Sequence, residues 1–160
     1  MVNHAIKFGI FAGQFECYLY MIISEIETQI VDEFSMFEDW MDKYNYLIEL
    51  GRSLPLIDEK YKTDQYIISG CQSKVWLHAE FKDGLVIFTA DSDAIITKGI
   101  IYILIRVLSN HTPDEIIASK MDFVDQIGLK EHLSPTRSNG LTSMIKQMKL
   151  YALAFKTKTG

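Results

Sequence analysis

The stretch from Ala94 to Leu108 constrains the fold more than any other segment, because most of its residues are Ile, Leu or Val. A helix needs about 20 predominantly apolar residues to cross a bilayer. This stretch is shorter than that and carries Lys98 and Arg106. A segment of this kind has to be buried by the rest of its own chain. We therefore expect a central, buried helix.

A β-hairpin is expected directly before this helix. Along Lys74–Phe81, apolar residues alternate with more polar ones, as in a strand with one buried face. Lys82–Gly84 has the composition of a turn, in which glycine can take a positive φ. Leu85–Ala90 then forms the return strand. We expect the central helix to pack on this hairpin.

Helices are expected on both sides of the hairpin in the sequence. Apolar spacings of three and four predict them over residues 22–34, 37–50, 123–127 and 136–155. Thr112, Pro113 and Glu115 mark a further helix start, with Thr112 and Glu115 in the positions of a capping box, and Gly51 suits a C-terminal cap. This order predicts an α+β fold, in which helices cover one face of a small antiparallel β-sheet.

The chain of 160 residues has the length of one domain. We expect residues 1–21 to be an apolar N-terminal extension outside the native domain, residues 22–156 to be the domain, and residues 157–160 to be a tail. Met21 is an alternative start. Gln14 and Glu16 interrupt the apolar stretch near the N-terminus, and no small-residue cleavage site follows. This pattern does not favour a secretory signal or a membrane anchor.

Charge and cysteine content exclude several classes of function. Lys and Arg number 16 against 21 Asp and Glu, a net charge of -5, whereas proteins that track phosphates normally carry a basic excess. We therefore expect no nucleic-acid ligand. Cys17 and Cys71 are the two cysteines. Two are too few for a disulfide framework or for a four-thiolate zinc or iron–sulfur site within one chain.

Cys71 is the candidate reactive residue, and we assign no role to Cys17. Gly70 allows a tight turn before Cys71, which precedes a strand, and neighbouring amide groups would stabilise a thiolate. The alternative is a buried cysteine that acts as a small apolar side chain. No histidine lies close to Cys71 in the sequence as a base. A cysteine–histidine hydrolase stays open, because its residues need only meet in space.

Two further groups of polar residues are candidates for chemistry. Asp91 and Asp93 are either a pair of catalytic carboxylates or N-capping residues of the central helix. Arg137 either binds an anion or takes part in a structural ion pair. Gly140 indicates close approach to another backbone. No cysteine or histidine spacing indicates a metal site.

A series of short motifs resembles one protein family over about residues 22–155. In order they are Tyr46-Leu47-Ile48-Glu49-Leu50-Gly51, Gly70-Cys71-Gln72-Ser73-Lys74-Val75-Trp76, Ala90-Asp91-Ser92-Asp93-Ala94, Thr112-Pro113-Asp114-Glu115 and His132-Leu133-Ser134-Pro135-Thr136-Arg137. Together these motifs resemble the SufE family, the sulfur-acceptor proteins of iron–sulfur cluster assembly.

The resemblance implies a SufE/IscU-like fold and a role as a sulfur carrier. A cysteine desulfurase of SufS or CsdA type would transfer sulfur from its persulfide to Cys71, which would pass it to a SufB-type scaffold complex. Pyridoxal phosphate would belong to the desulfurase, so we expect no cofactor on this chain. The protein would stimulate its partner rather than act as a stand-alone enzyme. We expect a cytoplasmic protein without membrane or nucleic-acid partners, as a monomer or a homodimer.

The resemblance also implies roles for the residues around the cysteine. Gly70, Gln72 and Ser73 would form a mobile loop that turns the thiol toward an apolar pocket and releases it when a partner docks. Asp93 and Arg137 match family positions that support this loop or contact the partner. The alternative is a cluster or metal scaffold on the same fold. It is disfavoured because this domain lacks the three cysteines of such proteins.

Overall fold

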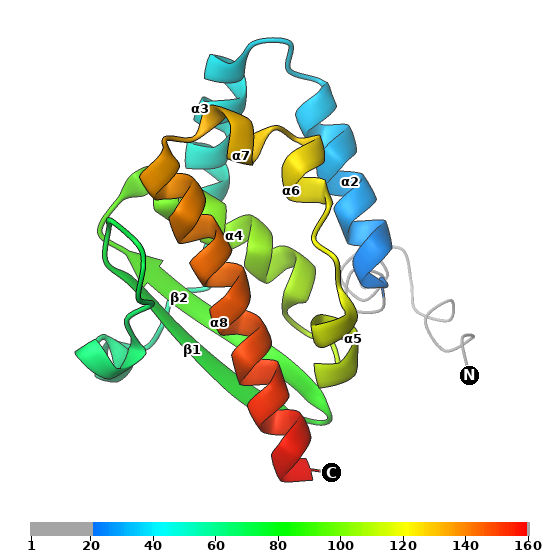
Figure 1. Cartoon of the computed structure of the whole chain (residues 1–160), viewed down its shortest axis with the longest axis vertical. Coiled ribbons are helices and arrows are strands. Elements are labelled where there is room, and N and C mark those ends of the chain that lie inside the picture. Colours follow the sequence, from blue (N-terminus) through cyan, green and yellow to red (C-terminus); the bar gives the residue numbers. More distant parts are fainter. Residues whose placement is uncertain (1–20, 160) are drawn as a thin grey trace, which may run out of the picture.

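Helix α4 (Ile95–Leu108) forms the centre of the fold, and ten of its 14 residues are buried. The fold is seen in a computed structural model, which describes residues 21–159 (Figure 1). The expected central helix is therefore confirmed. Among residues 21–159, no helix combines the length and the apolar character needed to cross a membrane. Cys17 and the expected extension, apart from Met21, lie outside the described residues.

Strands β1 (Val75–Lys82) and β2 (Leu85–Ser92) form the expected antiparallel hairpin. Leu77 lies opposite Ala90, and Ala79 lies opposite Phe88; all four side chains are buried. The two residues of the turn, Asp83 and Gly84, have φ angles of 53° and 80°. This geometry matches the right-handed twist of the strands. The alternating pattern thus identified the correct buried face. β1 begins and ends one residue later than expected, and β2 continues to Ser92, beyond the expected end at Ala90.

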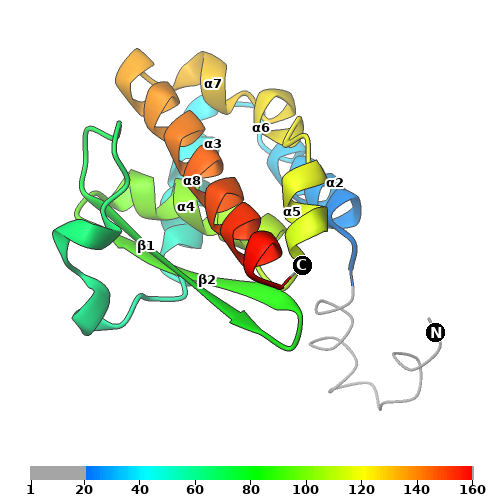
Figure 2. The same cartoon turned by 60° about the horizontal axis from the view of Figure 1, so that its bottom comes forward.

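Two helices cover the buried face of the hairpin. Figure 2 shows α4 and α8 (Pro135–Thr159) in a layer above the two strands, where α4 contacts β2 and α8 contacts β1. α2 (Ile23–Ser35) and α3 (Trp40–Gly51) pack against α4. The short helices α5 (Pro113–Ala118), α6 (Phe123–Gln126) and α7 (Leu129–His132) connect α4 to α8. The α+β fold with helices on one face of a small antiparallel sheet is confirmed.

The segment between α3 and β1 lies at the hairpin and contains the 3₁₀ turns η2 (Glu59–Tyr61) and η3 (Asp64–Tyr66). Ile67 forms a bridge with Trp76 of β1. The ring of Tyr61 stacks on that of His78, with centroids 3.9 Å apart. This segment leads directly into the loop that carries Cys71.

Gly51 has a different role from the expected one. It is the last residue of α3, and the C-cap is Arg52. A Cβ atom at Gly51 would lie 2.7 Å from the backbone nitrogen of Gly99 in α4, and one at Gly99 would lie 2.1 Å from the carbonyl oxygen of Leu47. The two glycines therefore allow close backbone packing of α3 on α4. The C-cap expectation was wrong because helix ends and close contacts both favour glycine.

The N-terminus of α4 also differs from the expectation. Its N-cap is Ala94, which provides no side-chain hydrogen bond, so neither Asp91 nor Asp93 caps the helix. By contrast, Thr112 and Glu115 form the expected capping box at the start of α5. α8 continues to Thr159, beyond the expected end near Phe155, because no glycine or proline interrupts it there.

Candidate functional site

Cys71 lies in the loop between Ile68 and β1, where its side chain is half-buried. Its Sγ atom is 3.7 Å from the carbonyl oxygen of Gly140 in α8. The cavity beside it is lined by residues of the loop, α4 and α8. They are Cys71, Gln72, Ser73, Thr97, Ile100, Thr136, Arg137, Gly140 and Met144. Helices that are distant in sequence therefore enclose one end of the cysteine loop.

Gly70 is suited to its position for two reasons. Its φ angle is 93°, a region that residues with a Cβ rarely adopt. A Cβ atom there would also lie 2.5 Å from Oγ of Ser143 in α8. The chain can therefore turn close to α8 at this point and present Cys71 to the cavity.

Gly140 allows α8 to approach the cysteine from the other side. A Cβ atom on residue 140 would lie 3.4 Å from Sγ of Cys71 and 3.7 Å from its Cα atom. The expected close approach of Gly140 to another backbone is therefore found, and the backbone belongs to Cys71. Any side chain larger than that of alanine would extend into the space that the thiol occupies.

The far end of the cysteine loop is held by Asp93 and Ser92. An oxygen of Asp93 accepts a hydrogen bond from the backbone nitrogen of Lys74 at 3.0 Å. The Asp93 backbone nitrogen donates to the Lys74 carbonyl oxygen at 3.3 Å, and the Ser92 hydroxyl donates to the same oxygen at 2.8 Å. Both polar groups of the Lys74 backbone are thus fixed to the end of β2. The loop is therefore anchored immediately before β1 begins.

Arg137 lies in the first turn of α8, where it is exposed and lines the Cys71 cavity. Its backbone nitrogen donates to the Ser134 hydroxyl at 3.4 Å. Within the described part of the chain no salt bridge involves this arginine, so the structure gives no support to the structural ion pair that we considered. Among the described residues that line the cavity, Arg137 thus provides the one cationic side chain.

Burial raises the pKa of the Cys71 thiol. Low polarity around a thiol disfavours the charged thiolate, which is the reactive form. Cys71 in this position is therefore a protected thiol.

No histidine from residues 21–159 lines the cavity around Cys71. His78 stacks on Tyr61, and His132 stacks on Trp40. His111 is buried with its Nδ1 atom 3.6 Å from Glu115. A cysteine hydrolase needs a base that contacts its nucleophile. The described geometry provides no such histidine.

Asp91 is the polar residue whose role the sequence did not reveal. It is buried near the end of β2 and forms ion pairs with Lys62 at 2.6 Å and Lys98 at 3.3 Å. Burial alone would raise the pKa of Asp91, but hydrogen bonds from Lys62, the Ser92 backbone and Lys98 outweigh it and lower the pKa. Asp91 therefore joins the η2 segment to α4, and it does not line the cavity of Cys71 as half of a catalytic pair.

Potential metal ligands are dispersed. Across residues 21–159, no three or more His, Cys, Asp or Glu side chains are grouped so that they could hold a metal ion. The described chemistry of the site thus consists of one thiol, one exposed arginine, the amide of Gln72 and three hydroxyl groups, beside the apolar side chains of Ile100 and Met144.

Comparison with known proteins identifies the family. The family model described as "SufE: Fe-S metabolism associated domain" matches residues 28–152. An uncharacterised SufE-like protein of Rhizobium meliloti is 41% identical over 126 residues, which cover 76% of this chain and 90% of that protein. SufE-like protein 1, chloroplastic/mitochondrial, of Arabidopsis thaliana is 37% identical over 81% of this chain, which corresponds to 35% of that longer protein.

A solved structure supports the fold independently. The solution structure of a hypothetical protein from Thermus thermophilus has a TM-score of 0.69 and 19% sequence identity, and the match covers 82% of this chain and 96% of that one. At this identity the similarity concerns the fold, whereas the family model and the relatives concern the sequence. The chain belongs to the SufE family, whose domain is associated with iron–sulfur metabolism.

Proposed function

We propose that this protein is a sulfur acceptor, which takes a sulfane sulfur from a cysteine desulfurase onto Cys71 and passes it to an iron–sulfur cluster scaffold. The observation that carries the proposal is the half-buried Cys71 thiol on a loop that α4 and α8 enclose. A carrier needs a thiol that is protected between partners and released on contact with them. An anchored loop with a glycine at its turn meets both needs.

The transfer balances without an added oxidant. The Cys71 thiolate attacks the terminal sulfur of the protonated desulfurase persulfide. A new S–S bond forms on Cys71, and the donor's S–S bond breaks, leaving its electron pair on the donor cysteine as a thiolate. The proton stays on the transferred sulfur. This reaction follows the chemistry of thiol–disulfide exchange, whose rate depends on the thiolate fraction and on access.

The rise in the pKa of Cys71 implies that docking has to move the loop. In the enclosed position burial disfavours the thiolate that the reaction needs. Movement about Gly70 would expose Sγ, and the exposed Arg137 lines the same cavity. A nearby positive charge favours the thiolate. We therefore assign loop positioning to Gly70, Gln72, Ser73 and Asp93, and thiolate or partner contact to Arg137.

The enclosed position would also suit the loaded state. The free space beside Cys71 is about 10 Å³, close to the volume of one water-sized sphere. One added sulfur atom would compete with water for this space. Ile100 and Met144 provide apolar contacts on the helix side. A persulfide would thus be shielded until the next partner binds.

The central test measures sulfur loading on the full chain. Cys71→Ser should abolish stimulation of a SufS- or CsdA-type desulfurase and the gain of one sulfur mass after incubation with that enzyme and cysteine. Cys17→Ser is the matched control and should behave as the wild type. Stimulation that survives in Cys71→Ser, or a mass gain located on Cys17, would overturn the proposal.

The hand-off is tested separately. Protein carrying radiolabelled sulfur on Cys71 is repurified and mixed with a SufB-type scaffold complex. We expect the label to move to the scaffold and to be absent from it when Cys71 has been alkylated beforehand. Loading without transfer would contradict the second step, the transfer to a scaffold, and would leave the protein as a sulfur acceptor alone.

A further inference from the structure

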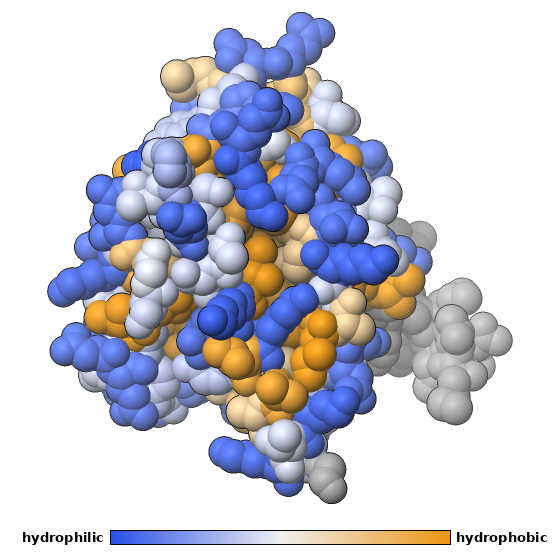
Figure 3. All heavy atoms as spheres, in the orientation of Figure 1, coloured by the Kyte–Doolittle hydropathy of each residue, from blue (hydrophilic) through white to orange (hydrophobic). Residues whose placement is uncertain are grey.

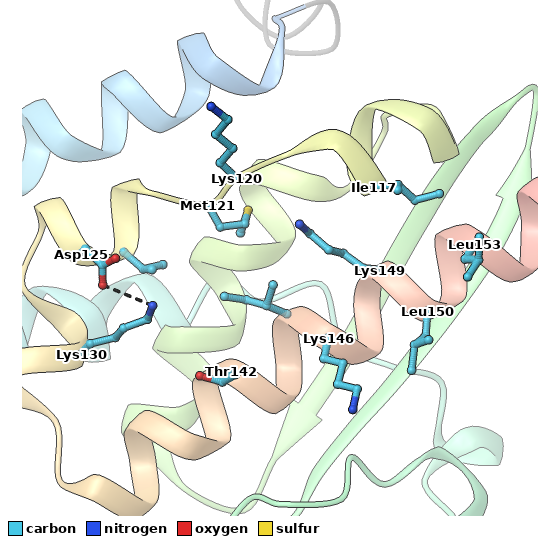
Figure 4. Close-up of a pocket in the computed structure, with 12 residues that line it drawn as sticks. Ile117, Lys120, Met121, Asp125, Lys130, Thr142, Lys146, Lys149, Leu150 and Leu153 are labelled. Atoms are coloured by element: carbon cyan, nitrogen blue, oxygen red, sulfur yellow. Dashed lines mark ion pairs between the residues drawn. The ribbon is translucent and has the colours of Figure 1, made fainter.

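An apolar groove lies on the side of α8 that faces α5 and α6, outside the Cys71 cavity. Its volume is about 470 Å³, within the range of ligand-binding clefts. Figure 4 shows its labelled residues coming from α8, from the short helices α5, α6 and α7, and from the segment between α5 and α6. The apolar lining consists of Ile117, Met121, Val124, Ile145, Leu150 and Leu153.

Part of this apolar lining is open to solvent. Leu150 and Leu153 are 46% and 47% exposed. In Figure 3 the hydrophobic surface gathers over the C-terminal half of α8 and over α5, with hydrophilic residues on both sides. A contiguous apolar patch with a polar rim indicates an interaction site.

The rim of the groove is basic, whereas the whole chain has a net charge of -5. Lys120, Lys130, Lys146 and Lys149 line it, together with one acidic residue, Asp125. Asp125 is neutralised by Lys130 at 3.3 Å, as the dashed line in Figure 4 shows. Local positive charge on an acidic protein points to an acidic ligand.

The four lysines are not equally available. Lys149 donates to the carbonyl oxygen of Ser119 and so spans the groove. Lys120 and Lys146 are exposed, and no salt bridge within residues 21–159 involves either of them. Two unpaired cations thus stand at the groove, one on the α5–α6 side and one on α8.

We propose that this groove binds an acidic amphipathic helix of a partner protein. Such a helix would place apolar residues at spacings of three and four on Ile145, Leu150 and Leu153, and carboxylates beside Lys120 and Lys146. The inference goes beyond the proposed sulfur transfer, because the groove does not include Cys71. Gly140 and Met144 of α8 face the Cys71 cavity, whereas Thr142 and Ile145 line the groove. A partner seated there would lie along the helix that encloses the reactive thiol.

Charge argues against two other occupants. A second copy that placed the same groove against this one would bring lysines against lysines, as a two-fold interface pairs like with like. Residues 1–20 of this chain contain Lys7 and Glu16 as their only Lys, Arg, Asp or Glu residues, so they have no acidic excess to complement the rim. An acidic amphipathic helix from another protein would complement both the apolar lining and the basic rim.

The test uses the full chain and a synthetic helical peptide with leucines at spacings of three and four and glutamates elsewhere. Its twin has lysine in place of every glutamate. Binding is measured by fluorescence anisotropy, and amide NMR shifts locate the contact. We expect the glutamate peptide to bind about tenfold more tightly than its twin, with affinity that falls as salt rises. The shifts should map to α8, α5 and α6.

The variant Leu150→Glu/Leu153→Glu should weaken binding of the glutamate peptide about tenfold, and Lys120→Glu/Lys146→Glu should do the same. Leu56→Glu, at a residue 62% exposed and outside this groove, is the matched control and should have no effect. Circular dichroism confirms that each variant is folded. Cys71→Ser should bind the peptide normally, so failure of this proposal and failure of sulfur transfer are distinguishable.

Four results would overturn the proposal. The first three are equal affinity for both peptides, shifts that map outside the groove, and a concentration-dependent dimer that the Leu150→Glu/Leu153→Glu variant abolishes while neither peptide binds. The fourth is binding of dodecanoate in the groove without binding of the glutamate peptide, which would indicate a fatty-acid ligand in place of a protein helix.

Discussion

The Sγ atom of Cys71 lies 3.7 Å from the carbonyl oxygen of Gly140, a residue 69 positions later in the chain. A Cβ atom at residue 140 would lie 3.4 Å from the sulfur, at ordinary van der Waals distance, so a side chain that extends beyond Cβ would have to displace the thiol. The enclosure of the thiol therefore depends on a small residue in α8, and a substitution there changes the size of the enclosure without altering the sequence of the cysteine loop.

Gly140→Val should displace the cysteine loop from α8. The two methyl groups would extend beyond a Cβ position that already touches Sγ, and overpacking of this kind costs about 1–3 kcal/mol. We expect alkylation of Cys71 by iodoacetamide to be roughly tenfold faster, because the open loop becomes more populated. Ala154→Val, on an exposed part of the same helix, is the control. An unchanged alkylation rate in Gly140→Val would show that Gly140 does not hold the loop closed.

Asp93→Ala should loosen the other end of the loop. The variant removes the acceptor for the Lys74 backbone nitrogen, a hydrogen bond worth about 0.5–1.5 kcal/mol. We expect faster amide hydrogen exchange over residues 70–75 and faster alkylation of Cys71. Asp93→Asn keeps an oxygen that can accept the same bond and should restore slow exchange. Identical exchange in all three proteins would exclude a positioning role for Asp93.

Cys71 should become reactive at higher pH in the folded protein than in the unfolded chain. Burial raises its pKa in the folded protein, so the protonated thiol stabilises the closed loop. That contribution is complete below the pKa of the unfolded chain and is lost as pH rises through the folded value. Alkylation rates measured on Cys17→Ser between about pH 7 and about pH 11 should therefore have a higher midpoint in the folded protein than in urea. Coincident midpoints would contradict the burial of the thiol.

Gly99→Ala should strongly destabilise the fold. The new methyl group would lie 2.1 Å from the carbonyl oxygen of Leu47, so α3 and α4 would have to separate. We expect a loss of about 3 kcal/mol or more in the free energy of unfolding, measured with urea. Gly84→Ala is the control. Gly84, unlike Gly99, has a positive φ, but no atom lies within 4 Å of the new Cβ, so this variant should cost about 1 kcal/mol. A smaller effect for Gly99→Ala than for Gly84→Ala would contradict the close packing.

The elements that could be predicted from the sequence are those whose pattern is local. The alternation along Lys74–Phe81 identified the buried face of β1, and the apolar run of Ala94–Leu108 identified the central helix. The Thr112 capping box was predicted for the same reason, since its partners lie three residues apart. In each case the physical cause is contained within one segment.

The contacts that the sequence did not predict join distant segments. Gly51 was interpreted as a cap because a helix end and a helix–helix contact leave the same signal. Asp91 was assigned to capping or catalysis because its partner Lys62 lies in a distant segment of the sequence. The family motifs singled out Cys71, but only the fold shows that Gly140 and Met144 enclose it.

Asp91→Asn should remove the charge that joins Lys62 to Lys98. Burial opposes ionisation of Asp91, but hydrogen bonds from the lysines and the Ser92 backbone outweigh it and lower the pKa, so the carboxylate stabilises the folded state above the unfolded pKa. This contribution is lost as pH falls through the folded value, below the ordinary value of 3.8. We expect the free energy of unfolding, measured with urea at neutral pH, to be about 1–3 kcal/mol lower in the variant than in the wild type. This difference between the two proteins should narrow once the pH falls below that ordinary value. Asp42→Asn, exposed on α3, should show neither effect. A gap that stays constant with pH would mean that Asp91 acts through packing rather than through its charge.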